Sequence, residues 1–509
     1  MSDAMPPVVD HDDASPPATG HSSSLLRARL ARRAALRPVE GRWAAVATVV
    51  GVAVAIAVIA AVFAPLAAAP VPGSFDGVPI PPVGAYSSSA FCSTGAGTAA
   101  IDTIYLTNST ARPVTGVMTA VGTASGSGAA PTQRRSVAVP ANGGVALNPA
   151  RGLPAGNNAS TFVFDGGGVV ASQVVSGGGG WSTAPCASRT STQWSFAGGS
   201  TTAGNALALT LYNPAATEAV VNVSFLTSTG KVTPQTYQGL VVPPGRELVE
   251  NVGDFVQNAS AIATFVTAQS GVLVSNEFQQ WSSGATSGLS LQLGAPALSS
   301  TWRFAQTTVV NGATVGFTLA NPSTATVTAS IALGLSSGSV VPRQMTIPPL
   351  STSVFNASAA AGLPRQVPYS VVVTSPTPIM VGRTVQAAAA ATPPLWGGSA
   401  GTVTLAGRWL VPGPGVLHAP GTPGATVESL AVANPGGTPA RVTVAAPDGT
   451  RAAMAFTVGP NSVVVLGPKQ VGGISALVVT SSTPVNVEED SGPSGSPGIV
   501  SSTGFPFTG

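Results

Sequence analysis

The stretch Trp194–Pro214, WSFAGGSTTAGNALALTLYNP, decides the fold of this chain. It begins with a tryptophan and leads through a strand-like run to an Asn-Pro dipeptide, which is a turn signal. The same features begin again at Trp302 and at Trp409, after intervals of 108 and 107 residues, and a weaker copy opens at Phe91. Self-similarity at a fixed period indicates internal repeats. The chain therefore contains about four copies of one unit, each about 105 residues long.

Each copy continues in the same order, first with a short apolar strand that ends in a proline-containing turn and then with two strands joined by a tight turn. The first feature reads VAVPANG, LVVPPGR, TIPPLST and TVGPNSV, and the second reads TFVFDGGGVVASQVV, ATFVTAQSGVLVSNE, YSVVVTSPTPIMVGR and SALVVTSSTPVNVEE. Six or more short strands per copy, with turn signals every eight to twelve residues, favour an antiparallel β-sandwich. A β-propeller blade needs only about 40–50 residues, so this period is too long for one.

We therefore expect an all-β fold in which about four antiparallel, Ig-like β-sandwich repeats follow one another as a tandem array. Their expected bounds are residues 86–189, 190–297, 298–404 and 405–509. A proline-rich linker, residues 65–85, precedes the first repeat and is expected to act as a spacer.

An uncharged apolar run of 22 residues, 43–64, stands near the N-terminus. A helix of this length covers about 33 Å, enough to cross the hydrocarbon core of a bilayer. Six arginines lie on its N-terminal side. The positive-inside rule therefore predicts a single-pass signal anchor, with a disordered, cytoplasmic tail over residues 1–42, basic near the membrane, and extracytoplasmic repeats. The alternative is a secretory signal peptide cleaved near Ala69, although the apolar run and its leader are longer than usual.

Charge is scarce and is not clustered on the outer part of the chain. Charged residues make up 8% of the sequence, against about 25% in an average soluble protein, and the net charge is +3. Beyond residue 42 the only lysines are Lys231 and Lys469. Nucleic-acid binding needs a clustered basic face, so we expect no nucleic-acid partner.

The two cysteines, Cys92 and Cys186, both follow the predicted membrane span. Disulfides persist outside the cytoplasm, and two cysteines allow one intramolecular pairing. Their separation is close to one repeat length. We therefore expect a disulfide that ties the start of the first repeat to its end.

The run from Trp194 to Trp281 resembles an uncharacterised β-repeat that is common in envelope proteins of actinobacteria, usually behind an N-terminal membrane segment. That family's repeat reads roughly WYFAEGST, then NP, then VP, then a strand ending in VAE. Gly198 stands where the family usually has glutamate, whereas Asn276-Glu277 keeps the late acid. The resemblance covers roughly residues 86–509. It implies a cell-envelope location, and the family has no assigned activity.

Residue types that carry catalysis or bind metals are rare outside the predicted tail. His11 and His21 fall on that tail, so only His418 could act outside, which excludes a histidine-based metal cluster there. The one G-x-S-x-G match, residues 397–401, is followed by strand-like sequence, whereas a nucleophile elbow needs a helix there. We expect no catalytic residue, no metal and no cofactor.

The outer acidic residues leave a carboxylate-based glycoside hydrolase open, since such enzymes need two carboxyl groups. They include Glu247, Glu250, Asp254, Glu277 and the run 488–490. That run lacks the spaced ligands of a calcium loop. The simpler interpretation, which we favour, is that these acids are solvated and lie at turns.

Six of the seven tryptophans follow the predicted membrane span and form pairs across the repeat junctions, namely Trp181 with Trp194, Trp281 with Trp302, and Trp396 with Trp409. The second member of each pair opens a strand and is expected in a repeat core. The first lies among glycines and serines, on a predicted loop. It could stack on a sugar or a partner protein, or act as a wedge between domains, and its regular junction position favours the wedge.

The leading expectation for function is a membrane-anchored, extracytoplasmic, non-enzymatic scaffold or interaction protein of the bacterial cell envelope, whose partner is an envelope protein or glycan. The alternative is a secreted polysaccharide-binding module, which cleavage near Ala69 would support. A carboxylate-based glycoside hydrolase is the third possibility.

Overall fold

The chain divides into two compact units, Met1–Pro72 and Gly73–Gly509. The computed structural model describes residues 81–507, all in the second unit, except residues 83–84, 124–128, 178–179, 284–285, 309–312, 337, 361–362, 364, 388–395, 413–425, 472–475 and 494–499. The predicted tail and membrane span, residues 1–42 and 43–64, lie outside the described residues. Over the part that is described, no helix is long and apolar enough to cross a membrane.

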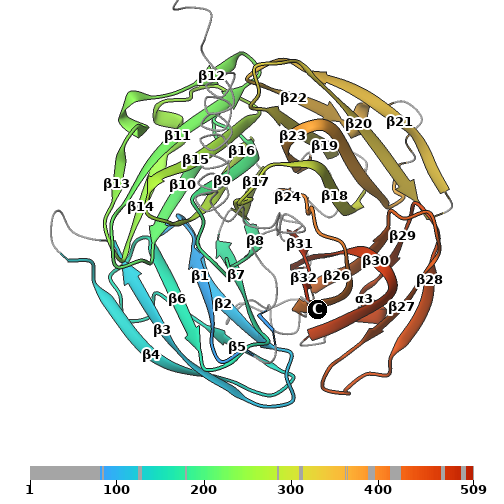
Figure 1. Cartoon of the computed structure of the whole chain (residues 1–509), viewed down its shortest axis with the longest axis horizontal. Coiled ribbons are helices and arrows are strands. Elements are labelled where there is room, and N and C mark those ends of the chain that lie inside the picture. The colour runs from blue at the N-terminus through green and yellow to red at the C-terminus, as the bar shows by residue number, and fades with distance from the viewer. Residues whose placement is uncertain are drawn as a thin grey trace, which may run out of the picture. The chain divides into compact units, whose positions relative to one another are not determined.

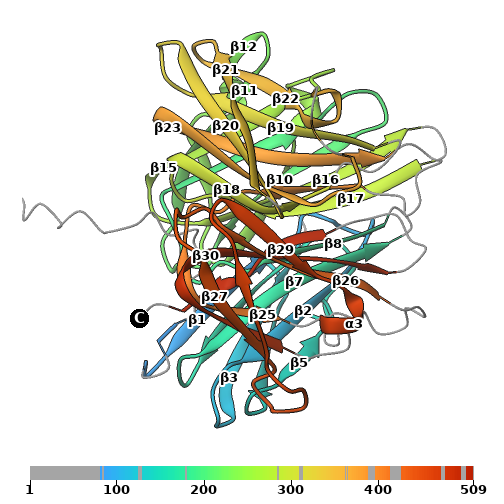
Figure 2. The same cartoon turned by 90° about the vertical axis from the view of Figure 1, so that its right-hand side faces the viewer.

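Strands make up nearly all of the regular structure, and they follow one another in four strand groups (Figures 1 and 2). Group 1 contains β1 (Ser88–Ser93), β2 (Ile101–Asn108), β3 (Val114–Gly122), β4 (Thr132–Val139), β5 (Gly144–Leu147), β6 (Asn158–Phe164), β7 (Val169–Gly177) and β8 (Gly180–Pro185). They form two sheets, ordered β1-β6-β3-β4 and β5-β2-β7-β8.

Group 2 repeats this plan with two sheets, ordered β14-β10-β16-β17 and β12-β11-β15-β9, and β13 also pairs with β11. Its elements are β9 (Gln193–Gly199), β10 (Ala206–Asn213), β11 (Ala219–Thr227), β12 (Gly230–Val232), η1 (Gln235–Tyr237), β13 (Leu240–Val242), β14 (Arg246–Asn251), η2 (Val252–Asp254), β15 (Ile262–Ser270), β16 (Val274–Ser283) and β17 (Thr286–Leu293).

In groups 3 and 4 one long strand, β23 or β30, takes part in both sheets of its group. Group 3 contains β18 (Ser299–Thr307), β19 (Ala313–Asn321), β20 (Val327–Leu335), β21 (Gly338–Ile347), β22 (Ser351–Asn356), η3 (Ala357–Ala359), β23 (Tyr369–Ala387) and β24 (Trp396–Ala400). Group 4 contains β25 (Ala406–Pro412), β26 (Thr426–Asn434), β27 (Ala440–Ala445), β28 (Met454–Val458), β29 (Ser462–Leu466), α3 (Pro468–Val471), β30 (Ala476–Pro493), β31 (Val500–Thr503) and β32 (Phe505–Pro506).

The strands pair antiparallel in every group, for example β1 with β6, β10 with β16, β19 with β23 and β26 with β30. The prediction of an antiparallel all-β fold is therefore confirmed. Alternating apolar residues explain individual strands, since β11 buries every second residue from Ala219 to Phe225. The core of each group lies between its sheets. In group 1, for instance, Phe162 of one sheet and Ile104 of the other belong to one buried cluster.

The tryptophan that opens each of groups 2 to 4 is buried and anchored by its indole nitrogen. Trp194 donates a hydrogen bond to the carbonyl of Leu273 at 2.9 Å, and Trp302 donates to that of Ile379 at 2.8 Å. Trp409 donates to the carbonyl of Val485 at 3.1 Å. All three rings are at most 1% exposed. Each ring thus fills the core while its one donor ties the first strand to the later strand pair.

The asparagine that ends the motif has an equally regular role in all four groups. Asn108, Asn213, Asn321 and Asn434 are at most 1% exposed. In group 2, the side-chain amide of Asn213 donates to the carbonyls of Thr217 and Val242 at 2.8 and 2.9 Å, and its oxygen accepts from the backbone N–H of Ala215. Equivalent bonds occur at the other three positions. The Asn turn and the strand before the proline turn therefore recur together because one side chain joins them.

Neighbouring groups also share buried apolar residues. Such mixed clusters join Ala184 with Phe278, Ala197 with Phe304, Ala305 with Ala431, and Ala187 with Phe505. The last pair joins group 1 to group 4. The strands β8, β17, β24 and β31, here called the four final strands although the two-residue β32 follows β31, also lie side by side in this order, and β31 lies next to β8 (Figure 1). Contacts therefore pass round the four groups in a closed cycle.

Candidate functional site

The four final strands are edge strands, each with one hydrogen-bonded neighbour in its sheet. An edge strand presents unpaired backbone N–H and C=O groups. Serines from adjacent groups satisfy two of them. The hydroxyl of Ser182 on β8 accepts from the N–H of Leu291 on β17 at 2.8 Å, and the hydroxyl of Ser290 donates to the carbonyl of Gly398 on β24 at 3.2 Å. Serine side chains thus link neighbouring edge strands, each of which has only one strand partner in the described part of its sheet.

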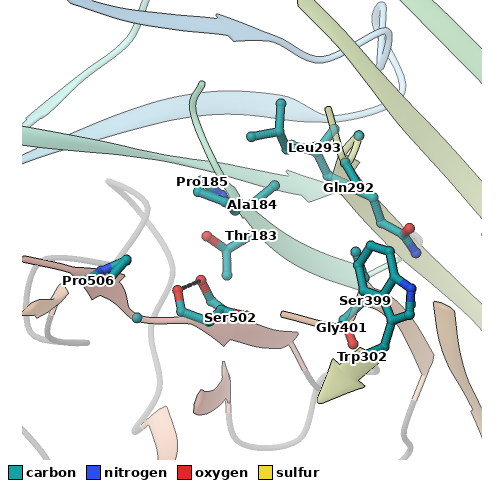
Figure 3. A pocket seen from close by; sticks show the side chains of 17 residues that line it. Thr183, Ala184, Pro185, Gln292, Leu293, Trp302, Ser399, Gly401, Ser502 and Pro506 are labelled. Atoms are coloured by element: carbon teal, nitrogen blue, oxygen red, sulfur yellow. Dashed lines mark hydrogen bonds between the residues drawn. The ribbon is translucent and has the colours of Figure 1, made fainter. Parts of the chain in front are cut away.

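A cavity of about 80 Å³, partly open to solvent, lies where these four strands meet (Figure 3). None of its lining residues is charged. They are Thr183, Ala184 and Pro185 from group 1, Leu291–Ala295 from group 2, Trp302 and Gly398–Gly401 from group 3, and Ser502–Gly504 and Pro506 from group 4. Thr183 and Ser502 lie near one another although they are separated by most of the described chain (Figure 3). All four groups are needed to form this site.

The G-x-S-x-G match, residues 397–401, forms part of this cavity wall. It lies on and just after strand β24, and its Ser399 hydroxyl accepts a hydrogen bond from Arg383 at 2.9 Å. A Cβ atom on Gly398 would lie 2.5 Å from the Gln292 side chain, and one on Gly401 would lie 2.8 Å from the ring of Phe304. The glycines allow β24 to approach its neighbours closely, and the match is not a nucleophile elbow.

In groups 2 to 4, one equivalent position on the strand that pairs with β17, β24 or β31 contacts the preceding group, and a different residue type occupies it each time. In group 2 it is Asn276, whose side-chain oxygen lies 3.4 Å from the hydroxyl of Ser93. In group 3 it is Gly382, where a Cβ atom would lie 2.0 Å from the carbonyl oxygen of Ala197. In group 4 it is Glu488. The register supports this equivalence, because each of these residues lies opposite the third residue before the motif asparagine.

Glu488 joins groups 3 and 4 through charged hydrogen bonds. One carboxylate oxygen accepts the backbone N–H groups of Ala305 and Gln306 at 2.8 and 3.1 Å. The other forms an ion pair with Arg383, and both side chains are at most 6% exposed. Arg383 also donates to the carbonyl of Gln306. Groups 3 and 4 are therefore joined by a buried ion pair whose carboxylate also accepts two backbone N–H groups.

The expectation that the outer acids are solvated residues at turns is wrong for Glu277, Glu488 and Glu489. All three lie on strands and are at most 5% exposed. The hydroxyl of Thr264 donates to Glu277, yet burial dominates and raises the pKa of this carboxyl to about 8. Asp254 is exposed, as expected. The sequence did not distinguish the buried acids from the exposed one, because the buried acids face other strands and other groups, which a local pattern does not reveal.

Two further carboxyl groups repel each other across the junction of groups 1 and 2. Asp102 lies on β2 and Glu247 on β14. Burial raises the pKa of Asp102 to about 7, against a smaller opposing effect of the hydrogen bond from Gln173 at 3.1 Å. Burial, with the charge of Asp102 as a smaller cause, raises the pKa of Glu247 to about 8, while the N–H of Thr94 opposes the shift. Near neutral pH Asp102 is therefore about half protonated, whereas Glu247 favours its protonated form.

The tryptophans before the junctions do not lie on loops where the structure describes them. Trp181 lies on β8 and Trp281 on β16, and each is 3% exposed. Trp181 packs with Tyr105 and Val174 of its own group. The loop prediction is wrong for these two residues. The backbone of Trp396 belongs to β24, and its side chain lies outside the described part of the structure.

The disulfide prediction is confirmed, since Cys92 and Cys186 are bonded with their Cα atoms 4.8 Å apart. Cys92 lies on β1, and Cys186 follows β8. The adjacent residues Phe91 and Ala187 form a reciprocal pair of backbone hydrogen bonds. The bond thus ties the first strand of group 1 to the segment that follows its last strand.

No group of three or more potential metal ligands is found among the described residues. The three histidines, His11, His21 and His418, all lie outside them. Sequence reasoning missed two residues at junctions between groups. Arg383 forms an ion pair with Glu488 of group 4, and Asp102 is a buried carboxyl group that interacts with Glu247 of group 2. The only signal for Arg383 was its place in the repeat, where the other copies have glutamine or glutamate.

Comparisons with known proteins give a partial family match and solved structures with low TM-scores. Residues 164–289 match the model of a family of unknown function, DUF5719. No curated protein matches the sequence. The solved structure titled "Crystal Structure of Thermotoga maritima 1070" is 18% identical over 18% of this chain and 82% of its own, with a TM-score of 0.17. A tetra-tandem repeat in the extending region of a large adhesion protein is 12% identical over 83% of this chain and 99% of its own, with a TM-score of 0.10. Part of this chain, across the junction of groups 1 and 2, is thus similar to an uncharacterised domain family.

Proposed function

We propose that this chain is a membrane-anchored, extracytoplasmic, non-enzymatic scaffold or interaction protein of the bacterial cell envelope. The four strand groups would be its Ig-like sandwiches, with bounds close to residues 86–189, 190–297, 298–404 and 405–509. Residues 43–64 would form the anchor. The observation that carries the proposal is the Cys92–Cys186 disulfide, because such bonds persist outside the cytoplasm.

The polar residues of the structure support a binding role over a catalytic one. Glu488 is engaged by Arg383 and by backbone N–H groups, so its lone pairs serve the junction of two groups. The cavity among the final strands has hydroxyl groups and apolar walls but no carboxyl group. General acid–base cleavage of a glycoside needs two carboxyl groups beside the substrate. A cavity of this composition suits recognition of a neutral ligand.

The topology can be tested with a chain that carries a different tag at each end. Protease added to intact cells should remove the C-terminal tag and spare the N-terminal one. The matched control is the same chain without residues 43–64, which should no longer fractionate with membranes. A C-terminal tag protected in intact cells would refute the proposed orientation.

The interaction role can be tested by retention on isolated cell envelopes. The full chain, solubilised in mild detergent, should sediment with washed envelope material and should be released when that material is depleted of polysaccharide or of protein. Recovery of the chain entirely in the supernatant would contradict an envelope partner. The disulfide should be intact in protein taken from the same envelopes after free thiols have been blocked.

A further inference from the structure

The cavity among the four final strands has the size and chemistry of a site for one small, neutral group. Its volume is about 80 Å³. An apolar cavity of about 150 Å³ holds benzene, so this one accommodates a group of about three or four heavy atoms. Because the cavity is partly open, a larger molecule can insert one end and leave the rest in solvent.

The ligand must be neutral, since the lining offers no countercharge. Arg383 approaches the wall through Ser399, but its charge is already paired with Glu488. An ion in the cavity would lose hydration without a partner. The walls formed by Pro185, Leu293 and Pro506 instead favour C–H groups.

Two hydroxyl groups of the lining are set up for opposite roles. The hydroxyl of Thr183 donates to the carbonyl of Gln173 at 3.0 Å, so its oxygen remains available as an acceptor. The hydroxyl of Ser399 accepts from Arg383 at 2.9 Å, so its proton remains available for donation. An alcohol can both donate and accept, and therefore complements this pair.

We propose that this cavity binds the hydroxymethyl end of a neutral hexose, such as the exposed end of an envelope polysaccharide. A hydroxymethyl group with its adjacent ring carbon matches the volume, and its C–H and O–H groups match the apolar walls and the two hydroxyls. This inference rests on the proposed envelope role and specifies the ligand class. All four strand groups contribute to the site, so it exists only when the cycle of contacts is closed.

The test uses calorimetric titration of the full chain in detergent with methyl α-glycosides of glucose, galactose and mannose. Methyl α-D-xylopyranoside is the matched control, because it lacks only the hydroxymethyl group of the glucoside. At least one hexoside should bind. The pentoside and the glucuronide, which replaces this group with a carboxylate, should bind at least tenfold more weakly. Titration with maltotriose then shows whether the end of an oligosaccharide binds as well as a methyl glycoside does.

Ser502→Leu should fill the cavity and abolish hexoside binding. Ser502 is partly exposed and its hydroxyl makes only a 3.4 Å contact with the carbonyl of Thr503, so the fold should tolerate the change. Ala216→Leu, at an exposed turn, is the control and should bind as the parent does. If Ser502→Leu lowers the melting temperature, Thr183→Val provides a second test, because it removes the acceptor oxygen at nearly the same volume and should weaken hexoside binding several-fold. Absence of binding by all three hexosides, or equal binding of the xyloside, overturns the inference. Retention on envelopes in that case would leave the proposed function standing.

Discussion

Removing either partner of the Arg383–Glu488 ion pair should destabilise the protein strongly, and by unequal amounts. Breaking a buried ion pair typically costs about 3–5 kcal/mol, because the remaining charge loses its partner in a poorly hydrated place. In Arg383→Met the carboxylate of Glu488 still accepts two backbone N–H groups, so we expect the lower end of this range. In Glu488→Gln the guanidinium of Arg383 retains only neutral acceptors. We expect the upper end of the range for this variant.

The double variant Arg383→Met/Glu488→Gln distinguishes a coupled pair from two separate contacts. Because no uncompensated charge remains, its destabilisation should be smaller than the sum of the two single effects, by about 2–3 kcal/mol. The measurement is urea unfolding of the oxidised protein at one salt concentration, with the slope of the transition compared among variants. Single variants within about 0.5 kcal/mol of the parent, or additive effects, would refute the reasoning.

Three further predictions follow from buried groups. Asn213→Ala should destabilise the protein by about 2–4 kcal/mol, since the buried carbonyl of Val242, the partly buried carbonyl of Thr217 and the N–H of Ala215 lose their partner. Chemical unfolding measures this, and an effect under about 1 kcal/mol would contradict it. Burial raises the pKa values of Asp102 and Glu247, so their stabilising contribution is full below about pH 4 and is lost as the pH rises through about 7 to 8. Melting temperatures from pH 5 to 9 should therefore fall in the parent and vary less in Asp102→Asn/Glu247→Gln. Reducing the bond between Cys92 and Cys186 should lower stability by about 2–4 kcal/mol, and a melting temperature unchanged by reductant would oppose this.

The sequence predicted the elements that depend on local pattern. The β-strands and the Asn turns could be predicted because alternation and turn residues act over a few positions, as in β11 and at Asn213. The disulfide could be predicted because only one pairing was possible. Trp194, Trp302 and Trp409 are buried in the core, as predicted for a tryptophan that opens the first strand of a repeat.

The closed cycle and the cavity could not be predicted, because they depend on how repeats meet and not on any single repeat. Asn276, Gly382 and Glu488 occupy one position yet share no chemistry, so no motif marks the junction. Solvated acids at turns were predicted only as the simpler interpretation of the sequence. Burial against a neighbouring group overrode that preference at Glu277 and Glu488.

The contact of β31 with β8 has a consequence for how this chain can evolve. A linear string of domains gains or loses a member by unequal recombination with little effect on the others, because its ends are free. Here the fourth group already touches the first, and Phe505 shares a buried cluster with Ala187. A fifth copy inserted in the gene would have no place between them, and loss of one copy would expose two apolar faces. Copy number in this region should therefore be held at four, while the individual copies remain free to diverge.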